Sequence, residues 1–86
     1  MTFSINDYIL CVDPNMENII YKSYIRAFKE NGEMLIKDQM NYDIKFDIVQ
    51  SNLQQENIIP KKHVIKKVTK DFTFDDFKEK YPEHYL

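Results

Sequence analysis

The chain contains a single glycine, and the position of this glycine constrains the fold more than any other feature of the sequence. Gly32 follows Asn31, and this pair favours a two-residue β-hairpin turn because both central positions of such a turn require positive φ. Glu30 and Glu33 flank the pair, and the apolar residues 34–36 follow it. The pair therefore predicts two antiparallel strands that meet at this turn. A single glycine also excludes the Gly-rich phosphate loops of nucleotide-binding proteins.

Two apolar segments before this turn have the properties of β-strands. Residues 8–12 form a short, continuous apolar run, and Asp13-Pro14-Asn15 follows it directly. An apolar run that ends in turn-forming residues is typical of a buried strand. Residues 19–29 alternate in part, and apolar residues that recur every four positions also permit a helix there. The hairpin turn that follows favours the strand.

The residues after the hairpin predict a second turn and a fourth strand. Residues 38–41, Asp-Gln-Met-Asn, favour a turn because aspartate and asparagine bond readily to nearby backbone groups. Residues 42–48 then alternate between apolar and charged side chains, as in a strand with one buried face and one exposed face. We therefore expect a meander of about four strands before residue 50.

The segment after the meander is harder to interpret. Ser51 and Gln54 fit a capping box and predict one helical turn at residues 52–57. Pro60 ends whatever element precedes it, because proline lacks a backbone N–H. Residues 64–68 place three apolar side chains among lysines. They predict a fifth strand, and their spacing leaves a short helix as the alternative.

A C-terminal helix is predicted at residues 73–81. Thr73 is a good N-cap, and the acidic residues of the first turn suit the positive end of the helix dipole. Phe72 before the cap and Phe77 inside the helix form a hydrophobic-staple pair. Pro82 ends the helix.

The length of the chain, 86 residues, suits one domain, because smaller pieces would bury too little surface to be stable. We expect a single domain over residues 1–86, with a strand meander or barrel at 3–49, a basic connecting segment at 50–71 and a C-terminal helix at 72–86. Apolar residues make up 43% of the chain, which is enough to build a core. The predicted fold class is mainly β (α+β): a small antiparallel barrel or meander of four to five strands, followed by a helix at about 73–81.

The composition also predicts where the protein resides. Cys11 is the only cysteine, so it has no partner for an internal disulfide, and small secreted domains usually contain several disulfides. No basic residue precedes a long apolar stretch at the N-terminus, so no secretory signal is expected. No apolar run approaches the roughly 18 residues needed to span a bilayer. We therefore expect a cytoplasmic protein with no membrane partner.

Several residues in the first half of the chain occur in an order that is found in one protein family. They are Phe3, Asp7, Cys11-Val12-Asp13, Lys22, Tyr24, Asn31-Gly32, Lys37-Asp38 and Phe46-Asp47-Ile48-Val49. In this order they resemble the small SH3-like barrels of short bacterial and phage-encoded proteins. Asn6 and Lys45 stand where that family has glycine and arginine. The resemblance covers residues 3–49 and implies a barrel that binds protein or nucleic acid and has no catalytic residue. If the chain is phage-encoded, its location would be the host cytoplasm.

Three groups of residues could carry chemistry, and each has a simpler structural explanation. Cys11 would need a positioned base to act as a nucleophile, whereas an apolar strand makes it a core residue. His63 and His84 lie far apart and lack the further ligands that a zinc site requires. The acidic residues within 75–79 suit the start of a helix. We expect no catalytic residue, no metal, no cofactor and no small-molecule substrate.

The segment from Lys61 to Lys70 contains five lysines and no acidic residue. Lysines neutralise phosphates regardless of base, so this segment could bind RNA or single-stranded nucleic acid. It could equally be a solvated edge strand whose lysines discourage aggregation, or a docking patch for an acidic protein. The candidate nucleic-acid-binding residues are Lys61, Lys62, His63, Lys66, Lys67 and Lys70.

Six tyrosines and six phenylalanines exceed what so small a core must hold, so some of them are expected at the surface. Tyrosine is enriched in protein interfaces, which makes Tyr81, Tyr85 and Leu86 the candidate protein-binding residues. The function expected is that of a non-catalytic, phage-type accessory protein that binds and modulates or inhibits a host protein, with a host defence factor as one candidate. The alternative is an RNA- or single-strand-binding protein that uses residues 61–70.

Overall fold

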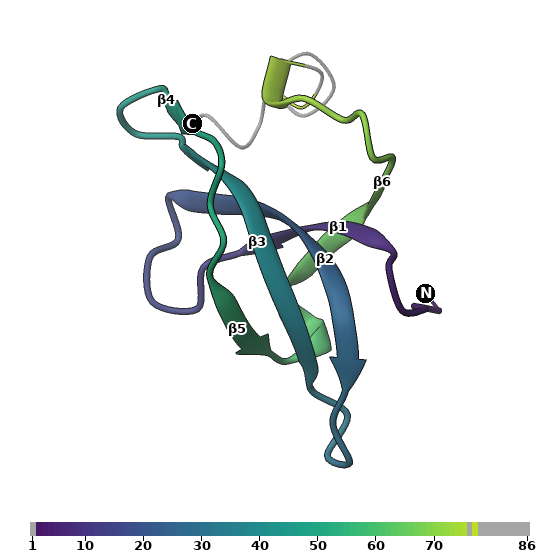
Figure 1. Cartoon of the computed structure of the whole chain (residues 1–86). Helices are drawn as coiled ribbons and strands as arrows, with labels where there is room; N and C mark the ends of the chain where they lie inside the picture. The colour runs from purple at the N-terminus through teal and green to yellow at the C-terminus, as the bar shows by residue number, and fades with distance from the viewer. Residues whose placement is uncertain (1, 76, 78–86) are drawn as a thin grey trace.

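The structure is a computed structural model that describes residues 2–75 and residue 77. Its six strands form an antiparallel sheet in the order β4-β3-β2-β1-β6, and β5 pairs with β3 (Figure 1). The elements are β1 (Tyr8–Val12), β2 (Ile19–Phe28), β3 (Met34–Asp43), β4 (Ile48–Gln50), β5 (Glu56–Ile59), the 3₁₀ helix η1 (Lys61–His63) and β6 (Val64–Val68). A mainly β fold is therefore confirmed, and so is the strand reading of residues 64–68.

The hairpin predicted at Asn31-Gly32 joins β2 to β3, but its loop is one residue longer than the predicted two-residue turn. Lys29 donates its backbone N–H to the Glu33 carbonyl at 2.7 Å, so three residues lie between the paired positions. Of these, only Gly32 has positive φ, at 87°. This conformation is a common three-residue hairpin loop that closes with a left-handed glycine. Asn31 supports the loop with its side chain, which accepts the Glu33 N–H at 3.1 Å.

The turn predicted at residues 38–41 is wrong, because β3 continues through it and the turn lies at residues 44–47. The strand predicted at 42–48 is therefore divided between the end of β3 and the start of β4. In Figure 1, β2 and β3 form a long, twisted pair that crosses the whole molecule.

Asp38 explains why β3 does not turn where the sequence suggests. Its side chain is fully buried, and the Ser23 hydroxyl donates to it from β2 at 2.5 Å. The Asn57 side-chain amide donates to the other carboxylate oxygen from β5. Partners so distant in the sequence replace the local backbone bonds that an aspartate makes in a turn.

The helical turn predicted at residues 52–57 is also wrong. The segment contains no helical residue and bonds to β3: the Leu53 N–H donates to the Gln39 carbonyl at 2.9 Å, and the Gln55 carbonyl accepts the Asp38 N–H at 2.8 Å. It leads into β5, which pairs with the first residues of β3. These long-range backbone bonds outweigh the local capping pattern.

Two hydrophobic clusters cover opposite faces of β1. Ile9 and Cys11 belong to one cluster and Leu10 to the other, because successive side chains of a strand point to opposite faces. This two-sided burial explains the continuous apolar run in β1. The first cluster contains Ile9, Cys11, Ile25, Met34, Ile36 and Ile59. The second contains Leu10, Ile20, Tyr42, Phe74 and Phe77.

The sheet is open within the described residues, since β4 and β5 share one edge of β3 while β6 ends the sheet beside β1. A closed barrel is therefore not present in that part of the chain. Residues 74, 75 and 77 are helical, and Phe72 packs against the cluster that contains Phe74 and Phe77. The rest of the helix predicted at 73–81 lies outside the described residues.

Candidate functional site

The basic segment does not form one continuous surface. Lys61 and Lys62 are exposed neighbours in η1, and His63 beside them is half-buried. Lys66 and Lys67 are successive residues of β6, so their side chains leave opposite faces of the sheet. Lys70 follows the strand, and its carbonyl accepts a hydrogen bond from the buried Lys22. Of the six candidate residues, only Lys61, Lys62 and His63 lie in the same element, the 3₁₀ helix η1.

Lys67 is engaged with other side chains. Its Nζ lies 3.2 Å from Asp7 Oδ2 and 5.7 Å from the centre of the Phe3 ring. A phosphate that used Lys67 would share its ammonium group with Asp7. The other candidate group, Tyr81, Tyr85 and Leu86, lies outside the described residues.

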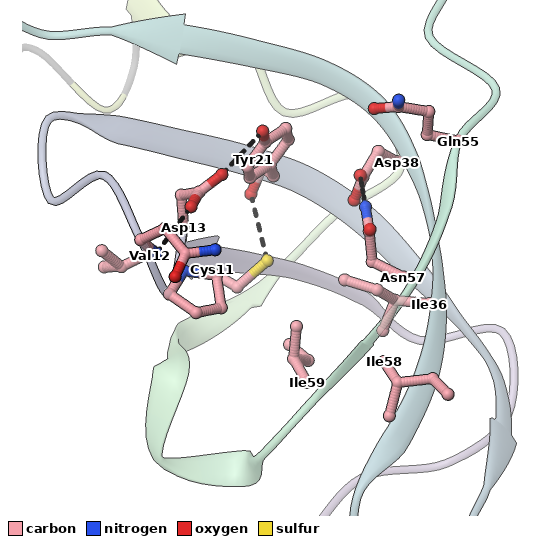
Figure 2. Close-up of a pocket in the computed structure, with 12 residues that line it drawn as sticks. Cys11, Val12, Asp13, Tyr21, Ile36, Asp38, Gln55, Asn57, Ile58 and Ile59 are labelled. Atoms are coloured by element: carbon pink, nitrogen blue, oxygen red, sulfur yellow. Dashed lines mark hydrogen bonds between the residues drawn. The ribbon is translucent and has the colours of Figure 1, made fainter.

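A polar cavity opens between the β1–β2 loop, β3 and β5, and its volume is about 230 Å³ (Figure 2). Two carboxylates, Asp13 and Asp38, line it together with the side chains of Tyr21 and Asn57. None of its described lining residues is basic. The full lining is Cys11, Val12, Asp13, Pro14, Asn15, Tyr21, Ile36, Asp38, Gln55, Asn57, Ile58 and Ile59.

Asp13 is the first residue of the β1–β2 loop, and three hydrogen bonds fix its carboxylate. One carboxylate oxygen accepts the backbone N–H groups of Asn15 at 2.8 Å and Met16 at 3.1 Å. The other accepts the Tyr21 hydroxyl proton at 2.9 Å. Burial and this hydrogen bond to Asp13 raise the pKa of the Tyr21 phenol above its ordinary value. Tyr21 therefore remains a neutral donor that fixes Asp13.

Asp38 lies on the sheet side of the same cavity. Burial raises the pKa of its carboxyl above the ordinary value of 3.8, and the hydrogen bonds from Ser23 and Asn57 oppose that shift. The charge of Asp13 adds to the increase in pKa.

Cys11 lies at the base of the cavity, where its sulfur is 3.9 Å from both the Tyr21 carbonyl oxygen and the Ser23 hydroxyl oxygen. Burial, followed by the charge of Asp38, raises the pKa of the thiol to about 12. A thiol with so high a pKa is protonated at neutral pH and is a poor nucleophile. The side chain is 1% exposed, which agrees with the core position predicted from the sequence.

Sequence reasoning missed most of the residues that form this cavity. Asp38 was assigned to a turn and Asn57 to a helical turn, whereas both lie in strands. No local signal marks either residue, because the sequence around Asp38 resembles a turn and the sequence around Asn57 resembles a helix. Pairing of the strands is what brings them together.

A second candidate surface is the hairpin that joins β3 to β4. Phe46 is 63% exposed, Ile48 54% and Val49 47%. Ile48 and Val49 are successive residues of β4, so neither face of this strand is packed. Within the described residues β4 pairs only with β3, and it ends the strand order of the sheet.

No group of three or more His, Cys, Asp or Glu side chains within the described part of the chain could hold a metal ion. No helix in that part is both long enough and apolar enough to cross a bilayer. Comparisons with protein-family models, with curated proteins and with solved structures give no match for this chain.

Proposed function

We propose that this chain is a non-catalytic binding protein that adds an extended segment of a partner protein to the edge of β4 with which no described strand pairs. The observation that carries the proposal is an edge strand whose two apolar side chains, Ile48 and Val49, are both about half exposed, at 54% and 47%. An edge strand offers unpaired backbone N–H and C=O groups to another strand.

The sequence of β4, Ile-Val-Gln, contains no charged residue and no proline. Soluble proteins normally protect an edge strand with lysine, proline or a covering element, because an apolar edge promotes association. The neighbouring Phe46 extends the apolar surface. The partner that fits is an extended segment with apolar side chains at alternating positions.

The resemblance to small phage and bacterial proteins makes a host protein the partner that we propose, with modulation or inhibition as the result of binding. The same resemblance supports an SH3-like arrangement of the sheet. Cytoplasmic location remains a prediction from the sequence.

The test compares two double variants of the whole chain. Ile48→Lys/Val49→Lys places charges on β4, and Ile5→Lys/Met16→Lys makes the same change at two other exposed apolar positions, 48% and 52% exposed. Both should keep the fold, since exposed substitutions usually change stability by about 0.5 kcal/mol or less. A partner captured by the wild type is purified and titrated against all three proteins. We expect the β4 variant to lose binding about a hundredfold or more, and the control variant to bind like the wild type.

Amide hydrogen exchange of the complex provides the second readout. Strand addition should slow exchange at residues 48–50, because their outward backbone groups become hydrogen-bonded. Equal partner affinity in the β4 variant, or unchanged exchange at residues 48–50 in the complex, would contradict the proposal. Failure to capture any protein from the host would also count against it.

A further inference from the structure

The loop that joins β2 to β3 exposes an asparagine that is followed by a glycine. Asn31 and Gly32 are both exposed, and the loop projects from the end of the β2–β3 pair, away from the rest of the sheet (Figure 1). Apart from the two chain neighbours, no heavy atom lies within 4 Å of the position where a Gly32 side chain would begin. Glycine has no side chain to hinder an approach to its backbone nitrogen, and the space around Gly32 is open.

An asparagine side chain can react with the backbone nitrogen of the residue that follows it. Here the Gly32 nitrogen would attack the side-chain carbonyl carbon Cγ of Asn31. The N–Cγ bond forms, the Cγ–Nδ2 bond breaks, and Nδ2 leaves as ammonia with the proton of the Gly32 nitrogen. The product is a five-membered succinimide ring within the main chain.

One water molecule then opens this ring at one of its two carbonyl carbons. Opening at Cγ restores the normal main chain and leaves an aspartate at position 31. Opening at the main-chain carbonyl carbon leaves an isoaspartate, in which the main chain runs through Cβ and Cγ and is one carbon atom longer. Both products therefore differ from the original chain by one ammonia lost and one water gained.

Three hydrogen bonds of the folded loop engage the atoms that would react. The Gly32 N–H donates to the Lys29 carbonyl at 3.0 Å, so the attacking nitrogen keeps its proton in this conformation. Asn31 Nδ2 donates to Glu33 Oε1 at 2.7 Å, and Asn31 Oδ1 accepts the Glu33 N–H at 3.1 Å. Both polar atoms of the Asn31 side chain are therefore bound to Glu33, and ring closure requires these bonds to break.

The bonds that engage Asn31 are local and lie in water. Both bonds between Asn31 and Glu33 are exposed and join residues only two positions apart. Exposed hydrogen bonds in a loop open at a lower free-energy cost than those of a packed core. The folded protein therefore reaches the reactive conformation by opening the loop, while β2 and β3 stay paired.

We propose that Asn31 is a site of spontaneous deamidation and backbone isomerisation, and that its hydrogen bonds to Glu33 limit the rate of this reaction in the folded protein. The substrate is the chain itself, and water is the only co-reactant. Glu33 acts as a positioning residue, because it holds the side-chain amide away from the Gly32 nitrogen. The proposal does not depend on the function proposed for β4.

The reaction should alter the end of the hairpin. Both products place a third carboxylate next to those of Glu30 and Glu33 and remove the amide that donates to Glu33. Like charges at this distance repel each other, and the isoaspartate also lengthens the loop by one backbone atom. The pairing of Phe28 with Met34, which adjoins the loop, should therefore weaken in the isoaspartate form.

The first experiment follows the whole chain over time at mildly alkaline pH, both folded and in urea. Peptide mapping by mass spectrometry with electron-transfer fragmentation locates each product and separates isoaspartate from aspartate. Asn15 is the internal control, because it is also exposed in a loop but is followed by Met16. In urea, we expect Asn31 to react at least about tenfold faster than Asn15, since a methionine side chain hinders the nitrogen and glycine does not.

In the folded protein, Asn31 should react more slowly than in urea and still faster than Asn15. Equal rates at Asn31 and Asn15 in the folded protein would overturn the proposal. So would the absence of isoaspartate at position 31 in the folded protein after the chain in urea has reacted.

Matched variants test the role of Glu33. Glu33→Ala removes the acceptor of the Asn31 amide, and we expect the folded protein to react about threefold or more faster. Glu33→Gln keeps a neutral acceptor and should give a smaller increase, because a carboxylate binds the amide more strongly. Glu30→Ala removes the same charge from the same loop and should leave the rate unchanged, and all variants should react alike in urea. Equal acceleration by Glu33→Ala and Glu30→Ala, or acceleration by neither, would overturn the role of Glu33.

Amide hydrogen exchange tests the effect on the hairpin. The isoaspartate form is purified by ion exchange and compared with the Asn31→Asp variant, which has the same added charge and a normal main chain. We expect residues 28–34 to exchange about threefold or more faster in the isoaspartate form than in this variant, and β1 and β6 to exchange equally in both. Equal exchange at residues 28–34 would overturn the predicted weakening of the hairpin.

Discussion

The Ser23 hydroxyl donates a hydrogen bond to the Asp38 carboxylate between directly paired positions of β2 and β3, with 2.5 Å between the two oxygens. Both residues have no exposed surface. A buried carboxylate is costly unless donors compensate for the lost water, so this bond couples the pairing of the two longest strands to the polar cavity.

Removing the donor should destabilise the fold. Ser23→Ala leaves the buried Asp38 carboxylate with Asn57 as its remaining side-chain donor. We expect the free energy of unfolding to fall by about 1.5–3 kcal/mol, the usual size of a hydrogen bond to a charged group. Urea unfolding followed by circular dichroism measures the change. The exposed Ser51→Ala is the matched control and should stay within about 0.5 kcal/mol of the wild type.

The pH dependence of stability should reveal the raised pKa of Asp38. The pKa of Asp38 is the ordinary value of 3.8 in the unfolded state and is higher in the folded state. At a pH between the unfolded-state pKa and the folded-state pKa, the folded protein therefore binds more protons than the unfolded protein. The contribution of this group to stability therefore falls as the pH rises through that window. An Asp38→Asn variant lacks the effect.

Unfolding measured for both proteins from pH 3 to pH 7 provides the test. The stability of Asp38→Asn relative to the wild type should increase as the pH rises. A constant difference across this range would mean that the pKa of Asp38 is the same in the folded and unfolded states.

The residues around Asp38 show which parts of the structure could be predicted. The Asn31-Gly32 hairpin and β1 were predictable, because neighbouring residues determine a positive-φ loop and a run of apolar residues. Asp38 and Asn57 were misread, because their sequence neighbours resemble a turn and a helix. Pairing of β3 with β2 and β5 decides their conformation, and that information is not local.

The candidate surfaces also differ in how much of them the sequence could predict. The core position of Cys11 followed from its apolar strand, whereas the carboxylate cavity required three separate segments to meet. The alternating pattern of residues 42–48 predicted that the Ile48 side chain is buried, but this residue is exposed. The reason is that the chain turns at residues 44–47 and that no described strand pairs with the other edge of β4. Alternation predicts a strand but does not say which face is covered.

The Cys11 thiol should be protected from reagents in the native protein. It is 1% exposed, and its pKa is raised to about 12, so both access and thiolate formation are suppressed. We expect iodoacetamide at pH 8 to label the native chain at least about a hundredfold more slowly than the chain in urea. Intact-mass spectrometry over time measures the rate. Rapid labelling of the native protein would show that the thiol is accessible and ionised.

The pKa of Asp7 should lie below its ordinary value of 3.8. The Ser4 backbone N–H donates to its carboxylate at 2.8 Å and is the largest cause of the lowered pKa, which burial opposes and Lys67 reinforces. Stabilisation by this group is present above pH 3.8 and is lost as the pH falls through the folded-state pKa.

A Lys67→Gln variant should therefore raise the pKa of Asp7 only in part. The backbone bond from Ser4 remains, so the pKa should stay below 3.8. Carbon-13 NMR of the Asp7 carboxyl carbon measures this titration directly. Lys62→Gln, in η1, is the control for general loss of positive charge and should leave the value unchanged. A full return to 3.8 in the Lys67 variant would mean that the ion pair alone lowers the pKa.

The division of the basic segment leads to a quantitative prediction for nucleic acid. Lys61 and Lys62 are exposed neighbours in η1, whereas Lys66 and Lys67 leave opposite faces of β6 and Lys67 contacts Asp7. A single strand that lies along one surface should therefore contact about two of these lysines. Each neutralised phosphate contributes about −0.7 to the slope of log K against log salt concentration, so the expected slope is about −1.4.

Fluorescence anisotropy with labelled oligouridine at several salt concentrations measures this slope. Lys61→Gln/Lys62→Gln should reduce it nearly to zero, and Lys66→Gln/Lys67→Gln, which removes the same charge from β6, should change it little. A wild-type slope near about −3.5 would mean that all five lysines between positions 61 and 70 contact phosphates together. That result would require β6 to present Lys66 and Lys67 on one surface, which a regular strand does not allow, and it would favour an RNA-binding role over strand addition at β4.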